Sequence, residues 1–356
     1  MQPAVSGEDR AAWLFELGEQ WRRQGQNREA IACYRQALER RPDWPEAHLS
    51  LGHTLLLEGD FLAGWEEMEW RWRLPGASLQ PFEQPLWAGE PLEGKRILLW
   101  AEQGFGDTLQ FVRFAAEVQR RGATVLLECQ PALARLMRSA PGIDEVIPFG
   151  APLPAFDLHA PLQRLPWILR TTLETIPAQV PYLRPEPVLV ERWRKRLAAC
   201  AGIKIGLVWS GNPRQVSNRS RSLAPELLAP LASIPGVTCF GLQPGTDGVV
   251  PKGTAPSVPG FVSGLGEELA DFSDTGAALV ALDLLITVDT AAAHLAGALG
   301  RPVWTLLSRP TDYRWLMERE DSPWYPTMRL WRQERAGDWA PVVARIERTL
   351  RELAGQ

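Results

Sequence analysis

The chain has 356 residues, of which 45% are hydrophobic and 22% are charged, so we expect a folded protein of two or three domains. Its net charge of −4 gives no basic surface for nucleic acid, and no apolar run reaches the roughly 18 residues that span a bilayer. The first residues lack the basic and apolar regions of a signal peptide, so we expect a cytoplasmic protein without a transmembrane segment.

Residues 11–74 contain an internal repeat. The pair Leu17–Gly18 recurs as Leu51–Gly52, 34 residues later, which is the period of the tetratricopeptide repeat. In this repeat, small residues allow two helices to approach closely. Gly64 stands where the second copy usually has Ala, which indicates a modified final repeat. Because about three repeats are usually needed to bury their faces, we expect either a structural appendage or a surface that recruits a protein acceptor.

A proline-rich connector over 75–94 precedes a pattern of alternating strands and helices, typical of a Rossmann-like α/β domain. The expected strands are 95–100, 124–128, 145–149 and 156–160, and the expected helices are 109–121 and 132–139. The turn after the first strand reads Gly104-Phe-Gly106-Asp107, which lacks the third glycine of a dinucleotide fingerprint. Its glycines would let the backbone approach a ligand, while Asp107 would either cap the helix or face that ligand.

A second α/β pattern follows a proline-rich crossing over 161–184. The strand expected at 204–209 ends in a turn that contains Ser210 and Asn212, and Gln243 follows the strand expected at 237–242. The intervening loop carries three arginines, Arg214, Arg219 and Arg221. Planar guanidinium groups chelate phosphate oxygens, so this loop is either a pyrophosphate clamp or a solvated basic loop.

The most informative stretch is 282–307. An apolar run over 284–288 predicts a buried parallel strand, Asp289 and Thr290 supply N-cap chemistry, and an Ala-rich helix follows from Ala291. Thr290 and His294 share one face of that helix, at the carboxyl end of the strand where phosphate is favoured. Asp289 would repel phosphate and suits hydroxyl groups instead. The alternative is a simple cap beside a buried histidine.

Two further helices are expected towards the end of the chain. One runs over 276–282 with Ser273 or Asp274 as its cap, and the other is an amphipathic helix over 339–353.

The stretch from Asp289 to Val303 reads D-T-x-x-x-H-L-A-x-A-L-G-x-P-V. It resembles the nucleotide-sugar site of the heptosyltransferase-like glycosyltransferases (glycosyltransferase family 9), including bacterial proteins that join such a domain to tetratricopeptide repeats. The resemblance implies an α/β fold of the GT-B type, with two facing Rossmann-like domains after an N-terminal α-helical repeat segment. It implies repeats over 1–75, an acceptor-side domain over 76–185, and a nucleotide-sugar domain over 186–356 whose terminal helix crosses back to the first domain.

The same resemblance implies transfer of a sugar from a nucleoside diphosphate to an acceptor hydroxyl, on a protein or on a cell-surface glycan. Asp107 takes the position of the proposed base, and Gly104 and Gly106 lie in its acceptor-side turn. The residues expected to bind the donor are Ser210, Asn212, Arg219, Arg221, Gln243, Asp289, Thr290, Ala291 and His294.

By this resemblance no cofactor is needed and the metal is dispensable, because arginines and a helix start would hold the charge of the leaving group. The sequence has no Asp-x-Asp motif, and its four cysteines form no C-x-x-C pair. Two alternatives stay open. One is a nucleotide-sugar epimerase or hydrolase of the same fold, and the other is a catalytically silent protein that binds partners through its repeats.

Overall fold

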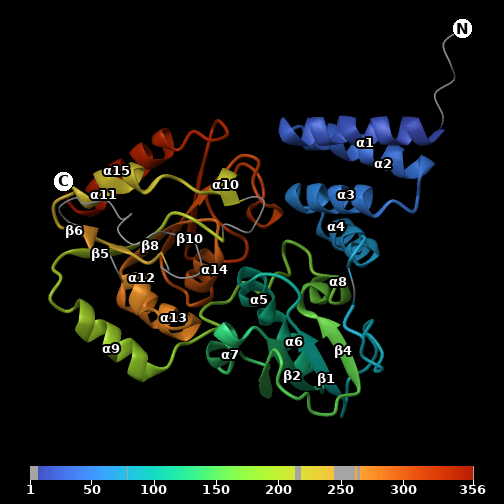
Figure 1. Ribbon diagram of the computed structural model, residues 1–356, viewed down its shortest axis with the longest axis horizontal. Helices are drawn as coiled ribbons and strands as arrows, with labels where there is room; N and C mark the ends of the chain where they lie inside the picture. Colours follow the sequence, from blue (N-terminus) through green and yellow to red (C-terminus); the bar gives the residue numbers. More distant parts are fainter. Residues whose placement is uncertain (1–6, 78, 213–217, 244–260, 263–264, 356) are drawn as a thin grey trace, which may run out of the picture. The chain divides into compact units, whose positions relative to one another are not determined.

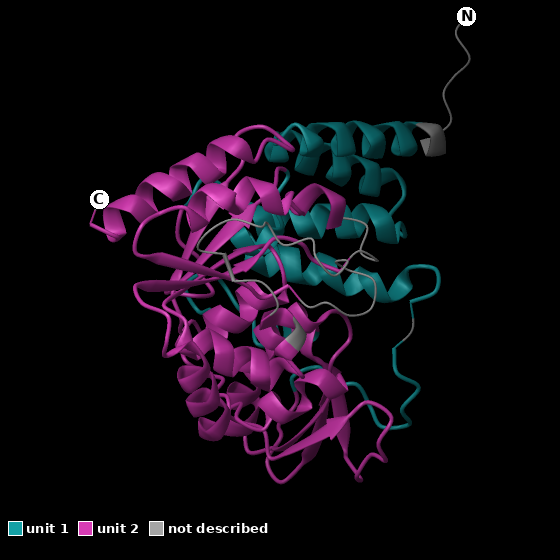
Figure 2. Ribbon diagram, turned by 60° about the vertical axis from the view of Figure 1, so that its left-hand side comes forward, with its two compact units in different colours: residues 1–89, 164–176, 310–319 teal, residues 90–163, 177–309, 320–356 magenta. Residues whose placement is uncertain are grey.

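The computed structural model divides into two compact units (Figure 2). Unit 1 consists of residues 1–89, 164–176 and 310–319, and unit 2 consists of 90–163, 177–309 and 320–356. The structure describes residues 7–77, 79–212, 218–243, 261–262 and 265–355.

Unit 1 is helical, and each of its first four helices packs against the next (Figure 1). These helices are α1 (Gly7–Arg23), α2 (Asn27–Arg40), α3 (Pro45–Leu57) and α4 (Phe61–Met68), followed by the 3₁₀ helix η1 (Glu69–Arg73). The later segments of the unit contribute α8 (Leu165–Ile168) and the 3₁₀ helix η5 (Tyr313–Trp315). Two contacts join these segments to the repeats: Arg164 bonds Glu69, and the Tyr313 ring lies edge-on to Trp65 with 5.8 Å between centroids.

Glycines set the spacing of these helices. A Cβ at Gly18 of α1 would come within 2.6 Å of the Tyr34 ring on α2, and a Cβ at Gly64 would lie equally close to Leu56. Tyr34 is fully buried, and its hydroxyl donates to Glu19 at 2.7 Å. Burial and this carboxylate partner raise the pKa of the Tyr34 phenol. The predicted close approach of helices at small residues is therefore present, and Gly64 provides it in the second pair.

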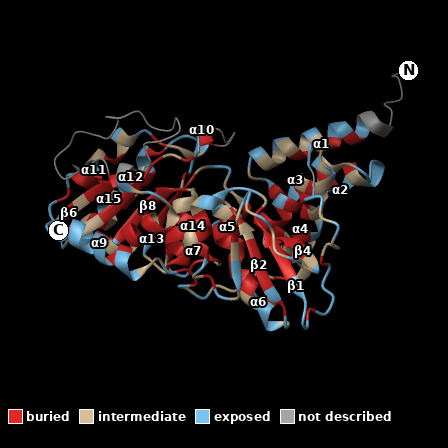
Figure 3. Ribbon diagram, turned by 60° about the horizontal axis from the view of Figure 1, so that its bottom comes forward, coloured by how far each residue is buried: buried red, intermediate tan, exposed pale blue. Residues whose placement is uncertain are grey.

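Unit 2 contains two parallel sheets, as predicted for two Rossmann-like domains. The first sheet has the order β3-β2-β1-β4 and the second the order β10-β9-β8-β5-β6-β7. The strands are β1 (Arg96–Trp100), β2 (Thr124–Cys129), β3 (Glu145–Pro148), β4 (Leu158–Pro161), β5 (Ile203–Val208), β6 (Val237–Gly241), β7 (Phe261–Val262), β8 (Leu284–Val288), β9 (Val303–Leu307) and β10 (Met328–Arg332). Apolar runs such as β8 and β9 are wholly buried, because parallel strands are covered on both faces. Figure 3 shows this for β8.

Helices connect these strands. They are α5 (Phe105–Phe111), η2 (Val112–Phe114), α6 (Ala115–Arg120), α7 (Pro131–Met137), η3 (Leu162–Arg164, which ends in unit 1), α9 (Pro187–Leu197), α10 (Asn218–Arg221), η4 (Pro225–Leu228), α11 (Ala229–Ala232), α12 (Leu265–Glu268), α13 (Phe272–Ala281), α14 (Ala291–Ala298) and α15 (Ala340–Leu353). The strand order reverses between β1 and β4 and again between β5 and β8. Ligands of open α/β sheets bind beyond the carboxyl ends of strands at such reversals.

Two helices begin four residues earlier than predicted. α13 starts at Phe272 because Asp271 is its N-cap and accepts the Asp274 N–H at 2.8 Å, which corrects the expectation that Ser273 or Asp274 is the cap. α5 starts at Phe105 because Gly104 takes the N-cap position. In both cases the first turn contains few apolar residues, so hydrophobic periodicity alone places the start too late.

The terminal helix α15 packs on the second sheet, since its buried residues Val342, Ile346 and Leu350 all belong to the core of that sheet. The crossing to the first domain that the resemblance implied stays a prediction. Among the described residues, the apolar face of α15 therefore covers the second sheet.

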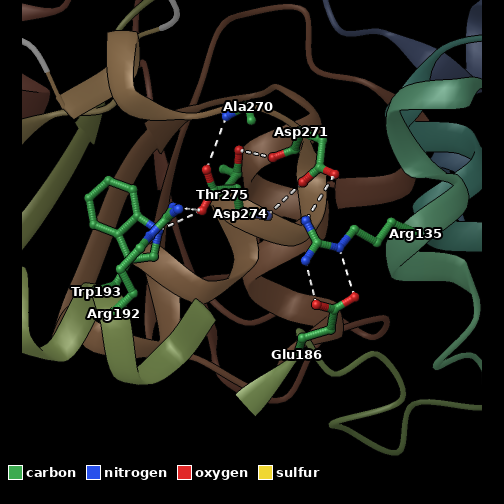
Figure 4. A network of polar contacts seen from close by, with 8 residues as sticks. All are labelled: Arg135, Glu186, Arg192, Trp193, Ala270, Asp271, Asp274 and Thr275. Carbon is green, nitrogen blue, oxygen red and sulfur yellow. Dashed lines mark hydrogen bonds and ion pairs between the residues drawn. The ribbon is translucent and has the colours of Figure 1, made fainter. Parts of the chain in front are cut away.

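A buried carboxylate connects α13 to α9 (Figure 4). Asp274 is 2% exposed and accepts the Trp193 Nε1–H at 2.8 Å and the Ala270 N–H at 3.1 Å, while Arg192 supplies the positive charge. A buried carboxylate is stable only when its lone pairs are satisfied in this way.

The first sheet is linked to this network through Arg135 of α7. Its guanidinium donates to the Glu186 carboxylate at 2.7 Å and lies 3.9 Å from the Asp271 carboxylate (Figure 4). Glu186 immediately precedes α9 and Asp271 caps α13. One arginine of the first half thus joins two helices of the second.

Asp274→Ala should lower the free energy of unfolding by about 3 kcal/mol, because it leaves Arg192 and the indole N–H of Trp193 without their buried acceptor. Glu268→Ala is the matched control: it removes a carboxylate from an exposed pair with Arg196, and should cost less than about 1 kcal/mol. Urea unfolding followed by tryptophan fluorescence measures both. Equal losses in the two variants would contradict the structural role of Asp274.

Candidate functional site

The strand ends at the reversal of the second sheet carry several of the predicted site residues. Val208 of β5 lies opposite Thr287 of β8. Ser210 and Asp289, each two residues further on, therefore leave the sheet side by side. This is the edge at which a ligand of such a sheet binds.

The turn after β5 is held by a small polar cluster. The Ser210 N–H donates to Gln243 Oε1 at 3.1 Å, which joins the end of β5 to the end of β6. The Ser222 hydroxyl donates to Ser210 Oγ at 3.1 Å, and Asn218 Oδ1 accepts the Gly211 N–H at 2.9 Å. The structure thus brings Ser210 and Gln243 together, and sequence reasoning missed the supporting Asn218 and Ser222.

Arg221 belongs to the same turn. A Cβ at Gly211 would lie 2.6 Å from Arg221 Nη2, so the guanidinium lies directly on the backbone of the turn. Asn212 and Arg219 are exposed, and no described contact joins Arg219 to the other predicted residues. Arg214 lies outside the described residues.

The start of α14 offers backbone N–H groups beside this turn. Thr290 is the N-cap residue, as predicted, but its side chain caps no backbone N–H within the described structure. Its hydroxyl lies 3.1 Å from Thr287 Oγ1 instead. Ala291 and Ala292 on the first turn are partly exposed. Unsatisfied N–H groups at a helix start, together with the helix dipole, favour an anion.

His294 is almost fully buried. It is 5% exposed, and its Nδ1 lies 2.9 Å from the Tyr325 hydroxyl. The two rings meet edge to face, with 5.7 Å between centroids. Tyr325 follows His294 by 31 residues in an irregular segment, so no motif or periodicity points to it.

The turn after β1 presents Asp107. Asp107 Oδ2 accepts the Gly104 N–H at 2.9 Å, so the carboxylate caps α5, as one of the two interpretations of the sequence predicted. A carboxylate has about four acceptor positions, so this bond leaves capacity for another donor. The neighbouring Phe105 is 39% exposed, and its ring centroid lies 4.8 Å from that of Phe272 on α13.

The two predicted halves of the site meet at Gly106. A Cβ at this position would lie 2.8 Å from His294 Cδ2, 3.4 Å from His294 Nε2 and 3.7 Å from the Ala291 Cα. Helices α5 and α14 accordingly pack against each other. The turn that carries Asp107 thus directly contacts the helix start predicted to bind phosphate.

Further polar groups lie at the carboxyl end of the first sheet. Glu102 Oε1 accepts the Gln163 N–H at 3.2 Å, across the reversal between β1 and β4. Gln130 after β2 donates to the Gln103 carbonyl at 3.0 Å. Partial burial raises the pKa of the Glu128 carboxyl on β2.

Within the described ranges, no group of three or more His, Cys, Asp or Glu side chains is arranged to hold a metal ion. The helices described here include none that is both long and apolar enough to cross a membrane.

Comparison with known proteins agrees with this architecture. A family model described as TPR repeat matches residues 18–59. Protein FlbA of Caulobacter vibrioides is 28% identical over 368 residues, which cover 92% of this chain and 59% of the relative, so the chain spans about three fifths of that protein.

Two solved structures resemble a large part of the chain. ADP-heptose LPS heptosyltransferase II of E. coli aligns with a TM-score of 0.50 at 13% identity, over 72% of this chain and 98% of that one. A glycosyl transferase family 9 protein of Veillonella parvula aligns with a TM-score of 0.49 at 14% identity, over 69% and 88%.

At identities this low, structural similarity is evidence for a similar fold only. The chain therefore joins a tetratricopeptide-repeat segment to a GT-B fold similar to that of heptosyltransferase II.

Proposed function

We propose that this chain is a glycosyltransferase that moves a sugar from a nucleoside diphosphate sugar to an acceptor hydroxyl. The observation that carries the proposal is the contact of Gly106 with His294 and Ala291. Through this contact, the turn that carries Asp107 lies against the start of α14, where backbone N–H groups favour phosphate. A base next to a site for a leaving diphosphate is the arrangement that glycosyl transfer requires.

The donor would occupy the carboxyl ends of β5, β6 and β8. Its diphosphate would receive hydrogen bonds from the first turn of α14 and from His294, with Arg221 as the counter-charge. Asp289 would accept from hydroxyl groups of the sugar, because a carboxylate repels phosphate. Ser210 and Gln243 join the ends of β5 and β6 and would border this ligand.

Asp107 would accept the proton of the acceptor hydroxyl. The acceptor oxygen forms a bond to the anomeric carbon while the bond from that carbon to the diphosphate oxygen breaks. The electron pair leaves with the diphosphate, whose charge Arg221 and the α14 start hold without a metal. An ordinary aspartate is a weak base at neutral pH, but it needs to accept a proton only as the hydroxyl becomes acidic in the transition state.

The proposal also concerns the identity of the sugar and of the acceptor. The E. coli relative is named for ADP-heptose, so ADP-heptose is the first donor to test, beside hexose donors carrying other bases. The repeats would recruit the acceptor, on a protein or a glycan, because tetratricopeptide repeats form surfaces that bind partners. We propose that this transfer takes place in the cytoplasm.

Asp107→Asn should leave donor affinity unchanged and reduce sugar transfer by about 10² to 10⁴-fold, the range for loss of a general base. Asn can still accept the Gly104 N–H, so α5 should keep its start. Titration calorimetry measures donor binding, and a transfer assay with a panel of nucleotide sugars measures turnover.

Asp157→Asn is the control for this variant. Asp157 accepts the Arg96 N–H at 2.8 Å at the amino end of β1, away from the proposed site, so transfer should be unaffected. Full transfer by Asp107→Asn would remove Asp107 from the mechanism. Consumption of nucleotide sugar by the parent protein without any acceptor would favour an epimerase or hydrolase.

Gly106→Ala should weaken binding of nucleoside diphosphates by about tenfold, equivalent to 1.4 kcal/mol, because the new methyl group displaces the His294 ring. Folding should survive, since Ala is the better helix former. Gly276→Ala in α13 is the matched control, because its Cβ would meet Leu299 at an ordinary 3.4 Å. Unchanged affinity in a folded Gly106→Ala protein would argue against a donor site at the contact of α5 and α14.

A further inference from the structure

Two side-chain amides hold the turn after β5 by their oxygen atoms. Gln243 Oε1 accepts the Ser210 N–H at 3.1 Å, and Asn218 Oδ1 accepts the Gly211 N–H at 2.9 Å. A backbone N–H can only donate, so in each amide it is the oxygen atom that faces the turn. The backbone therefore fixes the orientation of both amide groups, and each NH₂ group is directed away from the N–H that its oxygen accepts.

The two NH₂ groups have no hydrogen-bond partner among the described residues. Asn218 is only 9% exposed. Its Nδ2 atom, like Gln243 Nε2, is nevertheless not one of the described polar atoms that are fully enclosed without a partner. Both nitrogen atoms are therefore open to solvent or to a ligand. An amide NH₂ group offers two donors and no acceptor, so whatever binds there has to accept hydrogen bonds.

Arg221 adds a positive charge to the same turn. A Cβ at Gly211 would lie 2.7 Å from Asn218 Oδ1 and 2.6 Å from Arg221 Nη2, so the two side chains lie together on this glycine. Ser222 supports them, because its hydroxyl lies 3.2 Å from Asn218 Oδ1 and 3.1 Å from Ser210 Oγ. The turn thus gathers two amide NH₂ groups and one guanidinium, all of which donate hydrogen bonds.

We propose that Asn218 binds a phosphoryl group of the sugar donor, together with Gln243 and Arg221. A phosphoryl oxygen only accepts hydrogen bonds, whereas a sugar hydroxyl both donates and accepts, so a set of donors matches the phosphoryl group. The start of α14 offers further N–H groups after the neighbouring strand, because β5 pairs with β8. This assignment rests on the proposed function, and it adds a contact that no sequence pattern indicated.

The binding role of Asn218 can be separated from its role in the turn. Holding the Gly211 N–H requires only the oxygen atom, whereas binding phosphate requires the NH₂ group. Asp has the same shape as Asn and keeps an oxygen for the Gly211 N–H, but it replaces the NH₂ group by a second, negatively charged oxygen. Asn218→Asp therefore preserves the turn and places a repelling group where the donor stood.

The test compares the parent protein with full-length Asn218→Asp. Titration calorimetry measures the affinity for ADP, GDP and UDP, and ligand-observed NMR measures the affinity for the matching nucleosides. We expect the diphosphate that the parent binds to bind at least about tenfold more weakly to the variant. The affinity for the nucleoside, which has no phosphate, should be unchanged. Gln243→Glu makes the same exchange beside Ser210 and should act alike, so it decides the matter if Asn218→Asp does not fold.

Gln119→Glu is the charge-matched control. Gln119 of α6 donates to Asp144, which also accepts the Val125 N–H at the beginning of β2, so it lies at the amino edge of the first sheet. The new charge there should leave diphosphate affinity unchanged. Parent-like diphosphate affinity in folded Asn218→Asp and Gln243→Glu would overturn the proposal and leave the proposed function intact. Equal losses for nucleoside and diphosphate would reduce Asn218 to a support of the turn and would overturn it as well.

Inorganic pyrophosphate separates a failure of this contact from a failure of the proposed function, because it has neither base nor sugar. If the parent protein binds pyrophosphate but none of the nucleoside diphosphates, and Asn218→Asp weakens that binding, the phosphate contact stands while the proposed function loses support. A parent protein that binds neither pyrophosphate nor any of the nucleoside diphosphates would overturn both.

Discussion

The site depends on the contact between α5 and α14, which is possible because Gly106 has no side chain. At Gly106, α5 of the first sheet approaches α14 of the second so closely that a single methyl group would collide with His294. The contact joins the helix that follows β1 to the helix that follows β8. Both strands lie at a reversal of strand order, where an open sheet leaves room for a ligand. The two sheets therefore meet where α5 contacts α14. Here α5 carries a carboxylate, and the start of α14 favours an anion.

A set of polar contacts connects the two halves of unit 2. Arg135 of α7 reaches both Glu186 and Asp271, and Asp274 receives two donors from α9 (Figure 4). Because Asp271 caps α13, the same carboxylate that starts the helix also receives Arg135. Helix α13 is therefore held by Arg135 of α7 at its N-cap and by two donors of α9 at Asp274.

The sequence predicted the elements whose apolar runs are sharply bounded. β8 and β9 lie where the branched runs at 284–288 and 303–307 placed them, with Gly300 and Pro302 between. It did not place the starts of α5 and α13, since caps rather than apolar spacing set them. β10 escaped prediction because two arginines, Arg329 and Arg332, break its short apolar run. Arg113 and Tyr325 also escaped, because their partners are distant along the chain: Arg113 and Trp324 are separated by 211 residues. Such pairs exist only once the fold has formed.

Arg113 is a buried cation with no carboxylate partner among the described residues, and the end of α5 supplies a physical explanation. Arg113 stands just after the helix, where the last carbonyls point outward and the dipole is negative. It binds the Gln110 carbonyl directly and the Leu109 carbonyl through Tyr182. The faces of Tyr182, Trp324 and Tyr325 add the negative side of their ring quadrupoles, at 4.6, 5.4 and 4.6 Å. A carboxylate at this position would pair with Arg113 and cancel its field. With neutral partners only, the positive charge persists one tyrosine away from His294, and the short helix α5 carries a carboxylate near its first turn and a cation beyond its last.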